Sequence, residues 1–401
     1  MNRTLGIVTL CGMAAGASAQ AVDLGNITLF GTEYNVRRAS FNEQIQYEEP
    51  VFGGFTYEFT ASEGCHYKGN NRFLMATDAG DDFGSAKCQI VEVEILENAE
   101  GQFDGLQFVD LLVLEDSNVV GLNNEVDCDP SGLTINTSTE GFGAGQLVNV
   151  SGDEEVWAWD LAGGSSLIDG PVSILGSNTD SEDIEYIPAT GQFFTVIQDT
   201  PVSIIRYDNM LNPLDAAGDI PVGADGPLRG FGDPKGIFDI PDGPNAPADL
   251  QGLGGTAVVV FDDTGPGLEA YQYDGTPVAA AELADGMGES LLDFTEICSS
   301  IDPFNLQLES GSFDPETGRI FLVNQGDVNI CGFVYVLEPV DAGCNVADLA
   351  EPFGTLDLAD ISVFVTAFTT QGAAADLAEP FGTFDLADIS AFVTGFSAGC
   401  P

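Results

Sequence analysis

"DSEDIEYIPATGQFFTVIQD", from Asp180 to Asp199, is the clearest copy of a pattern that recurs along the chain. An acidic start leads into a short apolar run, a turn with proline and glycine, and a second run rich in β-branched and aromatic residues. Two such runs joined by a short connection that contains glycine are typical of an antiparallel hairpin. The stretch therefore predicts two β-strands joined by the "PATG" turn.

Diverged copies of this phrase recur along the chain, beginning at Ala61, Asp129, Asp233 and Glu309. Aligning Gly132, Asp183 and Gly236 gives steps of 51 and 53 residues, and the next step, to Gly311, is 75 residues. A unit of about 50 residues with four short strands matches one blade of a β-propeller. Residues 21–340 therefore predict an all-β propeller of about six blades, with two packed β-sandwiches as the alternative.

Two phrases in this region, "IEYIPATGQFFTV" from Ile184 and "FDPETGRIFLV" from Phe313, resemble those of known propellers. They are similar to bacterial β-propellers of the esterase-like phytase type and, more loosely, to NHL-type propellers. The resemblance implies a propeller and leaves two functions open. One is a binding or display domain, and the alternative is a secreted hydrolase of the esterase, phosphoesterase or glycosidase kind.

The residue types needed for catalysis are sparse or scattered. His66 is the single histidine of the chain, in the loop-like "GCHYKGNN", and residues 21–340 contain no G-x-S-x-G sequence that would supply a nucleophile. Acids recur near the ends of the expected strands, where they suit either a calcium site or ordinary turns; they are Asp78, Asp81, Asp82, Glu182, Asp183, Glu185, Asp199, Asp262, Asp263 and Asp327. These patterns assign no catalytic residue, and the sequence does not decide whether the protein is an enzyme.

The charge balance argues against some partners. The chain contains ten Lys and Arg and 64 Asp and Glu, which gives a formal net charge of −54. Such a chain repels phosphate backbones and anionic lipid headgroups, so we expect no binding to nucleic acid.

The first twenty residues have the features of a signal peptide. A basic "MNR" precedes an apolar run, and Ala17-Ser18-Ala19 forms a typical cleavage site. The apolar run is too short to span a bilayer, so we expect no membrane span. Residues 1–20 therefore predict a secreted, extracellular protein that could be attached to the cell surface.

The C-terminal region, 342–401, contains a nearly exact duplication. "ADLAEPFGTLDLADISVFVTAF" starts at Ala347 and "ADLAEPFGTFDLADISAFVTGF" starts at Ala375, with 19 of 22 positions identical. In each copy a loop-like first half precedes apolar residues at helical spacing, as in Ile361, Phe364 and Phe368. One such helix cannot cover its apolar stripe alone, so the duplication predicts a small all-α pair related by a pseudo-two-fold axis.

An acidic loop, a glycine, an apolar residue and an Asp that opens an amphipathic helix together resemble one half of a dockerin module. The duplication and the closing "GC" add to this resemblance to the dockerin-like ends of secreted bacterial proteins. It implies weak calcium binding by the loop carboxylates Asp348, Glu351, Asp357, Asp360, Asp376, Glu379, Asp385 and Asp388. Each loop departs from the pattern by one extra residue and lacks oxygen ligands at Ala350 and Phe353, which leaves a metal-free helical hairpin as the alternative.

The same resemblance implies a protein partner. Dockerin-like modules attach their protein to a cohesin-like or other extracellular or cell-surface protein through the helices. Positions that match this role here are Ser362, Thr366, Ser390 and Thr394.

Cysteines in a secreted protein favour disulfides. Cys344 and Cys400 bracket the duplication, and a two-fold helical pair brings its ends together, so we expect them to be paired. Local spacing also suggests disulfides between Cys65 and Cys88 and between Cys298 and Cys331, which would leave Cys128 unpaired.

Overall fold

In this computed structural model of the chain, the described residues are 21–40, 43–49, 53–59, 63–77, 86–99, 101–116, 130–151, 155–163, 167–174, 181–198, 202–214, 219–223, 226–228, 234–261, 267–283, 308–324, 333–340, 347, 349–350, 356–370, 375, 377–378 and 384–399. Backbone contacts divide the chain into two units, Met1–Pro339 and Val340–Pro401. The expected signal peptide, 1–20, lies outside the described residues.

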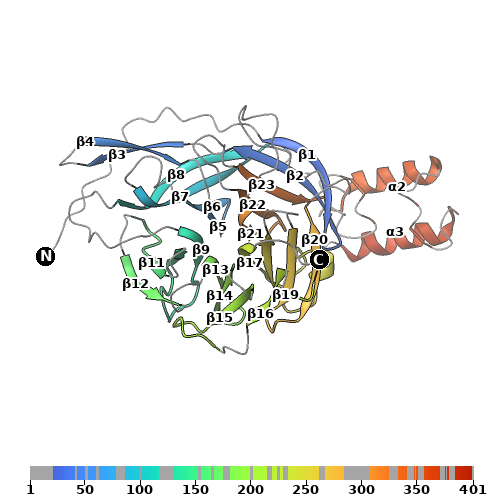
Figure 1. Ribbon diagram of the computed structural model, residues 1–401. Helices are drawn as coiled ribbons and strands as arrows, with labels where there is room; N and C mark the ends of the chain where they lie inside the picture. The colour runs from blue at the N-terminus through green and yellow to red at the C-terminus, as the bar shows by residue number, and fades with distance from the viewer. Residues whose placement is uncertain are drawn as a thin grey trace. The chain divides into compact units, whose positions relative to one another are not determined.

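The first unit is a five-bladed β-propeller (Figure 1). Four blades are antiparallel four-stranded sheets whose strands follow chain order from the axis outward. Blade 1 contains β5 (Gly64–Gly69), β6 (Arg72–Thr77), β7 (Ala86–Glu97) and β8 (Phe103–Asp116); blade 2 contains β9 (Pro130–Ile135), β10 (Leu147–Ser151), β11 (Glu155–Trp159) and β12 (Leu167–Ser173). Blade 3 contains β13 (Ser181–Ile187), β14 (Gln192–Ile197), β15 (Ser203–Tyr207) and β16 (Ile220–Pro221); blade 4 contains β17 (Pro234–Ile240), β18 (Thr256–Phe261), β19 (Gly267–Gln272) and β20 (Pro277–Glu282).

The fifth blade is built from both ends of the unit. Its strands run in the order β21 (Leu308–Phe313), β22 (Ile320–Asn324), β23 (Phe333–Pro339), β2 (Thr32–Ser40) and β1 (Val22–Leu29). β2 pairs antiparallel with β23, from Tyr34 opposite Pro339 to Ser40 opposite Phe333. This pairing joins the start of the unit to its end and closes the ring. β3 (Glu43–Glu49) and β4 (Gly53–Phe59) form a two-stranded sheet of their own.

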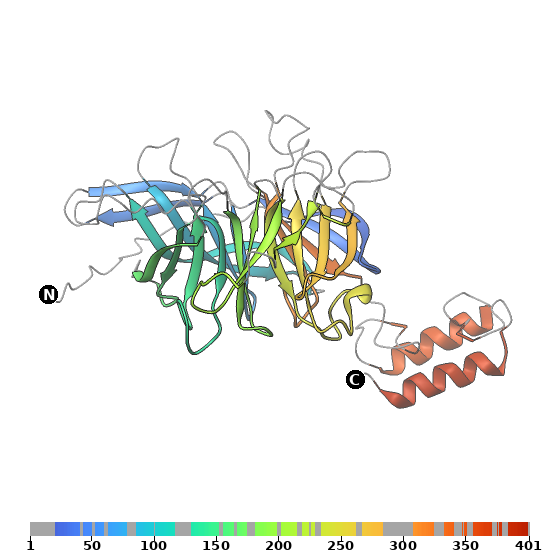
Figure 2. The same cartoon turned by 60° about the horizontal axis from the view of Figure 1, so that its bottom comes forward.

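The expected count of about six blades is therefore wrong by one. The first strands complete the last blade, and the β3–β4 hairpin stands outside the blades. The long step of 75 residues contains 284–307, which lie outside the described part. The alternative of two sandwiches is also wrong, because the innermost strands contact one another in a closed cycle of β5, β9, β13, β17 and β21. Figure 2 shows these sheets from a second direction.

Each pair of neighbouring blades shares one hydrophobic core, which gives five cores around the ring. A blade therefore buries both of its faces, and its middle strands are apolar without alternation. In β18, "TAVVVF", all six residues are buried. In β11, the side chains of Trp157 and Trp159 are both buried against blade 1.

Glycines end the inner hairpins that the repeated phrases predicted. Gly191 in "PATG" and Gly318 in "PETG" have φ angles of 68° and 78°, a backbone conformation that favours glycine. In the second turn, Gly318 N–H donates to the Asp314 carbonyl at 2.8 Å. The turn residues thus fix the connection between the first two strands of each of these blades.

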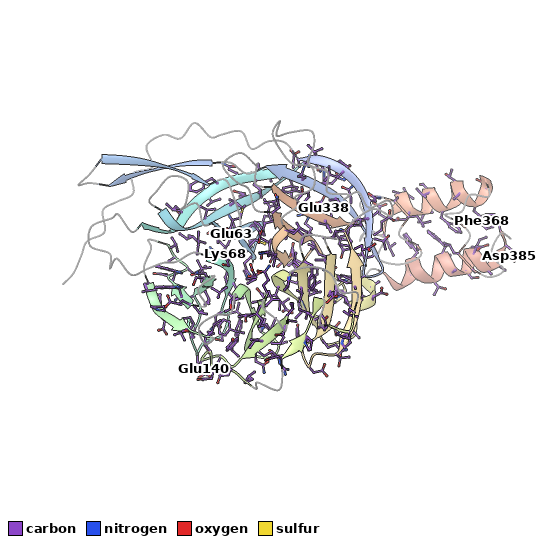
Figure 3. The ribbon with its side chains drawn as sticks, viewed as in Figure 1. Glu63, Lys68, Glu140, Glu338, Phe368 and Asp385 are labelled. Carbon is purple, nitrogen blue, oxygen red and sulfur yellow. The ribbon has the colours of Figure 1, made fainter. Side chains whose placement is uncertain are left out.

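The second unit contains two helices, α2 (Leu358–Thr370) and α3 (Leu386–Ala398), which confirms the predicted helical pair. The side chains of Phe364 and Phe392, which are equivalent in the duplication, stack with ring centroids 4.1 Å apart. Ala347 and Ala375 complete the buried centre, and Phe368 packs against it (Figure 3). Among the described residues, no helix has the length and hydropathy needed to cross a membrane.

Candidate functional site

The innermost strands pass very close to one another around the propeller axis. A Cβ atom on Gly64 would lie 2.8 Å from the Cα of Gly132, and one on Gly132 would lie 2.5 Å from the Cα of Asp183. A Cβ atom on Gly236 would likewise lie 2.7 Å from the Cα of Ser310. Such distances exclude a side chain. Gly132 and Gly236 therefore leave the space that Asp183 and Ser310 fill, and Gly64 allows its strand to approach that of Gly132.

Asp183 is the buried carboxyl at this level, with 1% of its surface exposed. Its Oδ1 accepts a hydrogen bond from Ile184 N–H at 2.8 Å. Its Oδ2 accepts from Ile237 N–H at 3.0 Å and from Ser310 Oγ at 2.8 Å. Burial raises the pKa of Asp183 well above its usual range, although these three donors act against the rise. The carboxyl therefore holds blades 3, 4 and 5 together.

His66 and Glu185 meet in the same central region. They lie on β5 and β13, which are not neighbouring strands of the ring, and His66 Nδ1 is 3.5 Å from Glu185 Oε2. Both side chains are largely buried, with 15% and 8% of their surfaces exposed. The single histidine thus lies inside the propeller beside an acid, rather than in the loop suggested by its sequence.

Asp239 and Tyr273 add a further acid, partly buried, near this group. Tyr273 donates its hydroxyl to Asp239 Oδ1 at 2.5 Å. Burial raises the pKa of Asp239 to about 7, the Tyr273 hydrogen bond acts against the rise, and the charge of Glu185 adds to it. We call Asp183, Glu185, His66, Asp239 and Tyr273 the axial cluster.

The axial cluster includes part of the acidic set that the sequence singled out. Glu182, Asp183 and Glu185 lie on β13 at or near the axis, and Lys235 Nζ lies 3.2 Å from Glu182 Oε1. The other seven acids of that set lie outside the described residues. Within the described part of the chain, no group of His, Cys, Asp or Glu has the arrangement of a metal site.

Sequence reasoning missed Asp239, Tyr273 and Ser310. Asp239 lies in "GIFDI", and an acid inside an otherwise apolar strand was the available signal. Ser310 had no comparable signal, because its partner Asp183 is 127 residues away.

In the helical unit, Asp360 and Asp388 make the same contacts in their two copies. Asp360 accepts from the backbone N–H groups of Leu349, Ala350 and Asp357 at 2.7, 2.9 and 2.8 Å. Asp388 accepts from the equivalent groups at 2.8, 3.0 and 2.9 Å, which belong to Leu377, Ala378 and Asp385. Each carboxylate therefore ties its loop to the start of its helix.

These contacts also change the pKa values. Burial acts to raise the pKa of Asp360, but the backbone donors outweigh burial and lower it. The hydrogen bond from Asp385 is the main reason that the pKa of Asp388 is lowered. Both carboxylates are therefore ionised at neutral pH.

The other predicted metal ligands are only partly described. Asp357 and Asp385 accept from Ala359 and Ala387 N–H at 2.6 and 2.7 Å, as helix caps do. Figure 3 labels Asp385 at the start of α3. The remaining four predicted ligands lie outside the described residues: Asp348, Glu351, Asp376 and Glu379.

The four predicted partner-binding residues, Ser362, Thr366, Ser390 and Thr394, are all exposed. Apolar side chains lie beside them at equivalent positions of the two helices. Leu358 and Leu386 are 73% and 74% exposed, and Val365 and Val393 are 52% and 54% exposed. We call these four apolar residues, with the four hydroxyl residues, the repeated helix faces.

The suggested pairing of Cys65 with Cys88 is wrong. β6 lies between their strands, which puts the strands roughly 9–10 Å apart, and Cys65 is level with Val91 rather than with Cys88. The two residues are therefore beyond the reach of about 7 Å that a disulfide allows. Cys65 is a free thiol, 1% exposed, and burial raises its pKa well above the usual range. Cys128, Cys298, Cys331, Cys344 and Cys400 lie outside the described residues.

No family model matches the chain, and no curated protein sequence matches it. Several solved structures are similar in part. Glutaminyl cyclase from Myxococcus xanthus is 12% identical with a TM-score of 0.40, covering 70% of this chain and 92% of that one. A Bacteroides thetaiotaomicron protein of unknown function is 12% identical with a TM-score of 0.38, covering 82% of this chain and 71% of that one. A glucose dehydrogenase is 9% identical with a TM-score of 0.36, covering 79% of this chain and 98% of that one. Likeness at this level carries no argument about activity.

Proposed function

We propose that this protein is a secreted β-propeller binding protein that its helical unit attaches to an extracellular or cell-surface protein. The repeated helix faces are the observation that carries the proposal. Exposed apolar side chains that gather on a surface are typical of protein interfaces. Leu358 and Leu386, each almost three-quarters exposed, occupy equivalent positions, so both copies offer the same surface to a partner.

Charge narrows the chemistry of the partner. Residues 342–401 contain eight Asp and Glu and no Lys or Arg. A surface with apolar side chains and a rim of Lys or Arg would complement the repeated helix faces and would be attracted by the acidic chain. A cohesin-like protein with such a surface fits the proposal.

The axial cluster supports a binding propeller over a hydrolytic one. A catalytic group must touch its substrate, whereas Asp183 is 1% exposed and accepts three hydrogen bonds from the protein itself. Asp239 is likewise held by Tyr273. These acids brace the blades, which leaves the outer surfaces of the propeller to present a ligand site.

A cell-attachment assay tests the proposal. Leu358→Asp, Val365→Asp, Leu386→Asp and Val393→Asp are combined in the full chain, and the fractions with cells and in the medium are measured. We expect the wild type to stay with the cells and the variant to appear in the medium. Leu167→Asp with Ile168→Asp is the matched control, because these propeller side chains are 44% and 52% exposed. Equal retention of the variant and the wild type would contradict the proposal.

A secreted hydrolase is the second candidate, favoured by the approach of His66 to Glu185 across the ring. A histidine beside an acid is the usual pair for moving a proton in catalysis. Purified protein is assayed with p-nitrophenyl esters, phosphates and glycosides, beside His66→Asn and Glu185→Gln. Turnover that both substitutions abolish, without loss of folding, would establish this function.

A further inference from the structure

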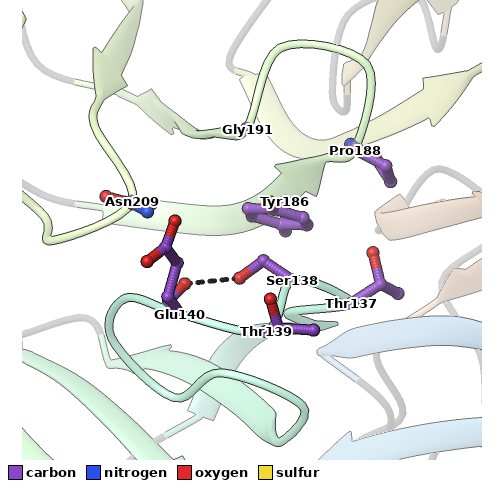
Figure 4. A pocket seen from close by; sticks show the side chains of 8 residues that line it. All are labelled: Thr137, Ser138, Thr139, Glu140, Tyr186, Pro188, Gly191 and Asn209. Atoms are coloured by element: carbon purple, nitrogen blue, oxygen red, sulfur yellow. Dashed lines mark hydrogen bonds between the residues drawn. The ribbon is translucent and has the colours of Figure 1, made fainter.

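Blades 2 and 3 line an open pocket of about 490 Å³ at the end of the propeller where their inner strands, β9 and β13, end. Thr137, Ser138, Thr139 and Glu140, from the connection between β9 and β10, form one wall. The opposite wall comes from the turn between β13 and β14 and from Asn209, with Tyr186 between them (Figure 4). This volume is within the range of about 300–1,000 Å³ that small-molecule sites occupy.

The two walls are fixed to each other by the backbone. Phe142 N–H donates to the Asn209 carbonyl at 2.7 Å, and Asn136 Nδ2 donates to the Phe142 carbonyl at 2.7 Å. Gly141 makes the close approach feasible: its φ is 104°, and a Cβ atom there would lie 2.4 Å from the Asn209 carbonyl oxygen. A ligand therefore meets a preformed pocket and does not bear the entropy cost of ordering its walls.

Several polar side chains of the pocket are not used by the fold. Within the described part of the chain, the side chains of Thr137, Thr139, Glu140 and Asn209 make no hydrogen bond. Tyr186 is only 4% exposed, and its hydroxyl, which also has no hydrogen bond to the described residues, lies 3.9 Å from the Cβ position of Gly191 at the pocket wall. The Tyr186 hydroxyl therefore lies at the pocket wall, where it can donate to a ligand or accept from it.

These groups decide the ligand class. Hydroxyls and an amide both donate and accept, and a carboxylate accepts two donors at once. Glu140 and the net charge of −54 repel an anion. An ammonium ion has no acceptor and would leave the amide N–H groups of Asn209 unmatched. Adjacent hydroxyl groups of a neutral sugar match the whole set.

We propose that this pocket binds a neutral saccharide, with Glu140 accepting from two sugar hydroxyls and Thr137, Thr139, Asn209 and Tyr186 completing the contacts. The inference deepens the proposed function, since it takes the propeller to be the binding domain and names its ligand class.

Calorimetric titration of the full chain tests it, with the methyl glycosides of glucose, galactose, mannose, xylose and N-acetylglucosamine and their β-linked disaccharides as probes. We expect saturable binding of at least one probe. Glu140→Gln should weaken it roughly tenfold, as the loss of a hydrogen bond to a charged group does, and Thr139→Val, which removes a neutral hydrogen bond, should weaken it about threefold. Glu316→Gln, the same charge change on the exposed turn of blade 5, should leave it unchanged.

Gly141→Ala gives a second, independent readout, because it pushes the two walls apart without removing a ligand contact. We expect it to abolish binding while unfolding still occurs in one cooperative transition. No binding of any probe up to about 20 mM, where the free energy gained would be only roughly 2 kcal/mol, would overturn the inference. Equal binding by the wild type and Glu140→Gln would also overturn it, as would binding of n-butylammonium in place of every sugar. The cell-attachment assay depends only on substitutions in the helical unit. Failure of the sugar titration is therefore distinguishable from failure of the proposed function.

Discussion

Ser310 donates a hydrogen bond to Asp183 across the propeller axis, although the two residues lie on blades that are not neighbours. Ser310 Oγ is 2.8 Å from Asp183 Oδ2, and the same oxygen accepts from Ile237 N–H. The backbone N–H of Cys65 in turn donates to Ser310 Oγ at 3.4 Å. One buried carboxyl and one hydroxyl thus connect four of the five blades.

Asp183→Ala should lower the free energy of unfolding by roughly 3 kcal/mol or more, because it leaves three buried donors without an acceptor. Asp183→Asn, the matched control, keeps one carbonyl oxygen and should lose less. Urea unfolding followed by tryptophan fluorescence measures both, since Trp157 and Trp159 are buried between blades 1 and 2. A loss below about 1 kcal/mol for Asp183→Ala would show that the carboxyl does not brace the ring.

The pKa of Asp239 gives a pH dependence with a definite sign. Its folded value of about 7 lies above the ordinary 3.8, so the folded state binds a proton that the unfolded state has released. Its contribution to stability is therefore full below pH 4 and is lost as pH rises to 7, by up to about 4 kcal/mol. Asp239→Asn should remove this loss.

The readout is the difference between the unfolding free energies of wild type and Asp239→Asn, measured from pH 4 to pH 8. Asp183 and Glu338, whose pKa values burial also raises, contribute equally to both proteins and cancel. Tyr273→Phe should steepen the loss, because it removes the hydrogen bond that favours the ionised acid. A difference that does not change with pH would mean that Asp239 is ionised throughout.

We propose that calcium binds weakly to the two acidic loops and that the helices do not depend on it. Asp360 and Asp388 already close each loop through backbone N–H groups, so an ion must share their oxygens. Hydrogen exchange of α2 and α3 in the full chain should be unchanged by chelator and should slow only at millimolar calcium. Loss of protection in chelator would assign the closing role to the ion instead.

Cys344 and Cys400 are expected to form a disulfide. Closing a loop of 55 intervening residues would remove about 4 kcal/mol of unfolded-state entropy, a large effect for a unit of this size. Peptide mapping of the non-reduced protein should find this pair together and Cys65 as a free thiol. Finding Cys344 or Cys400 in any other pair would rule out this disulfide.

The sequence predicted the propeller because its signals are local. Each "PATG" or "PETG" hairpin lies within about twenty residues, and the apolar strands reflect blades buried on both faces. Blade number was missed because it depends on closure, and β2 pairs with β23 from the opposite end of the unit. Nothing in β1 or β2 alone indicates which blade it joins.

The axial residues were predicted only in part, for a similar reason. Aligning the repeats brought Gly132, Asp183 and Gly236 to one level, as in the structure. The fourth position was set one residue off, at Gly311, because the equivalent position holds Ser310, which lies opposite Val323 as Gly236 lies opposite Val260. The roles of Asp360 and Asp388 were also beyond the sequence, since a carboxylate can serve a cation or backbone N–H groups equally well.

Binding of purified protein to stripped cells of the producing organism measures attachment through the repeated helix faces. Three variants are titrated beside wild type: Leu358→Asp with Val365→Asp, Leu386→Asp with Val393→Asp, and all four together. Since the two faces are equivalent, either pair alone should weaken binding only about twofold, and the fourfold variant should abolish it. Unchanged binding of the fourfold variant would contradict attachment by the helices, and complete loss from one pair alone would contradict the equivalence of the two faces.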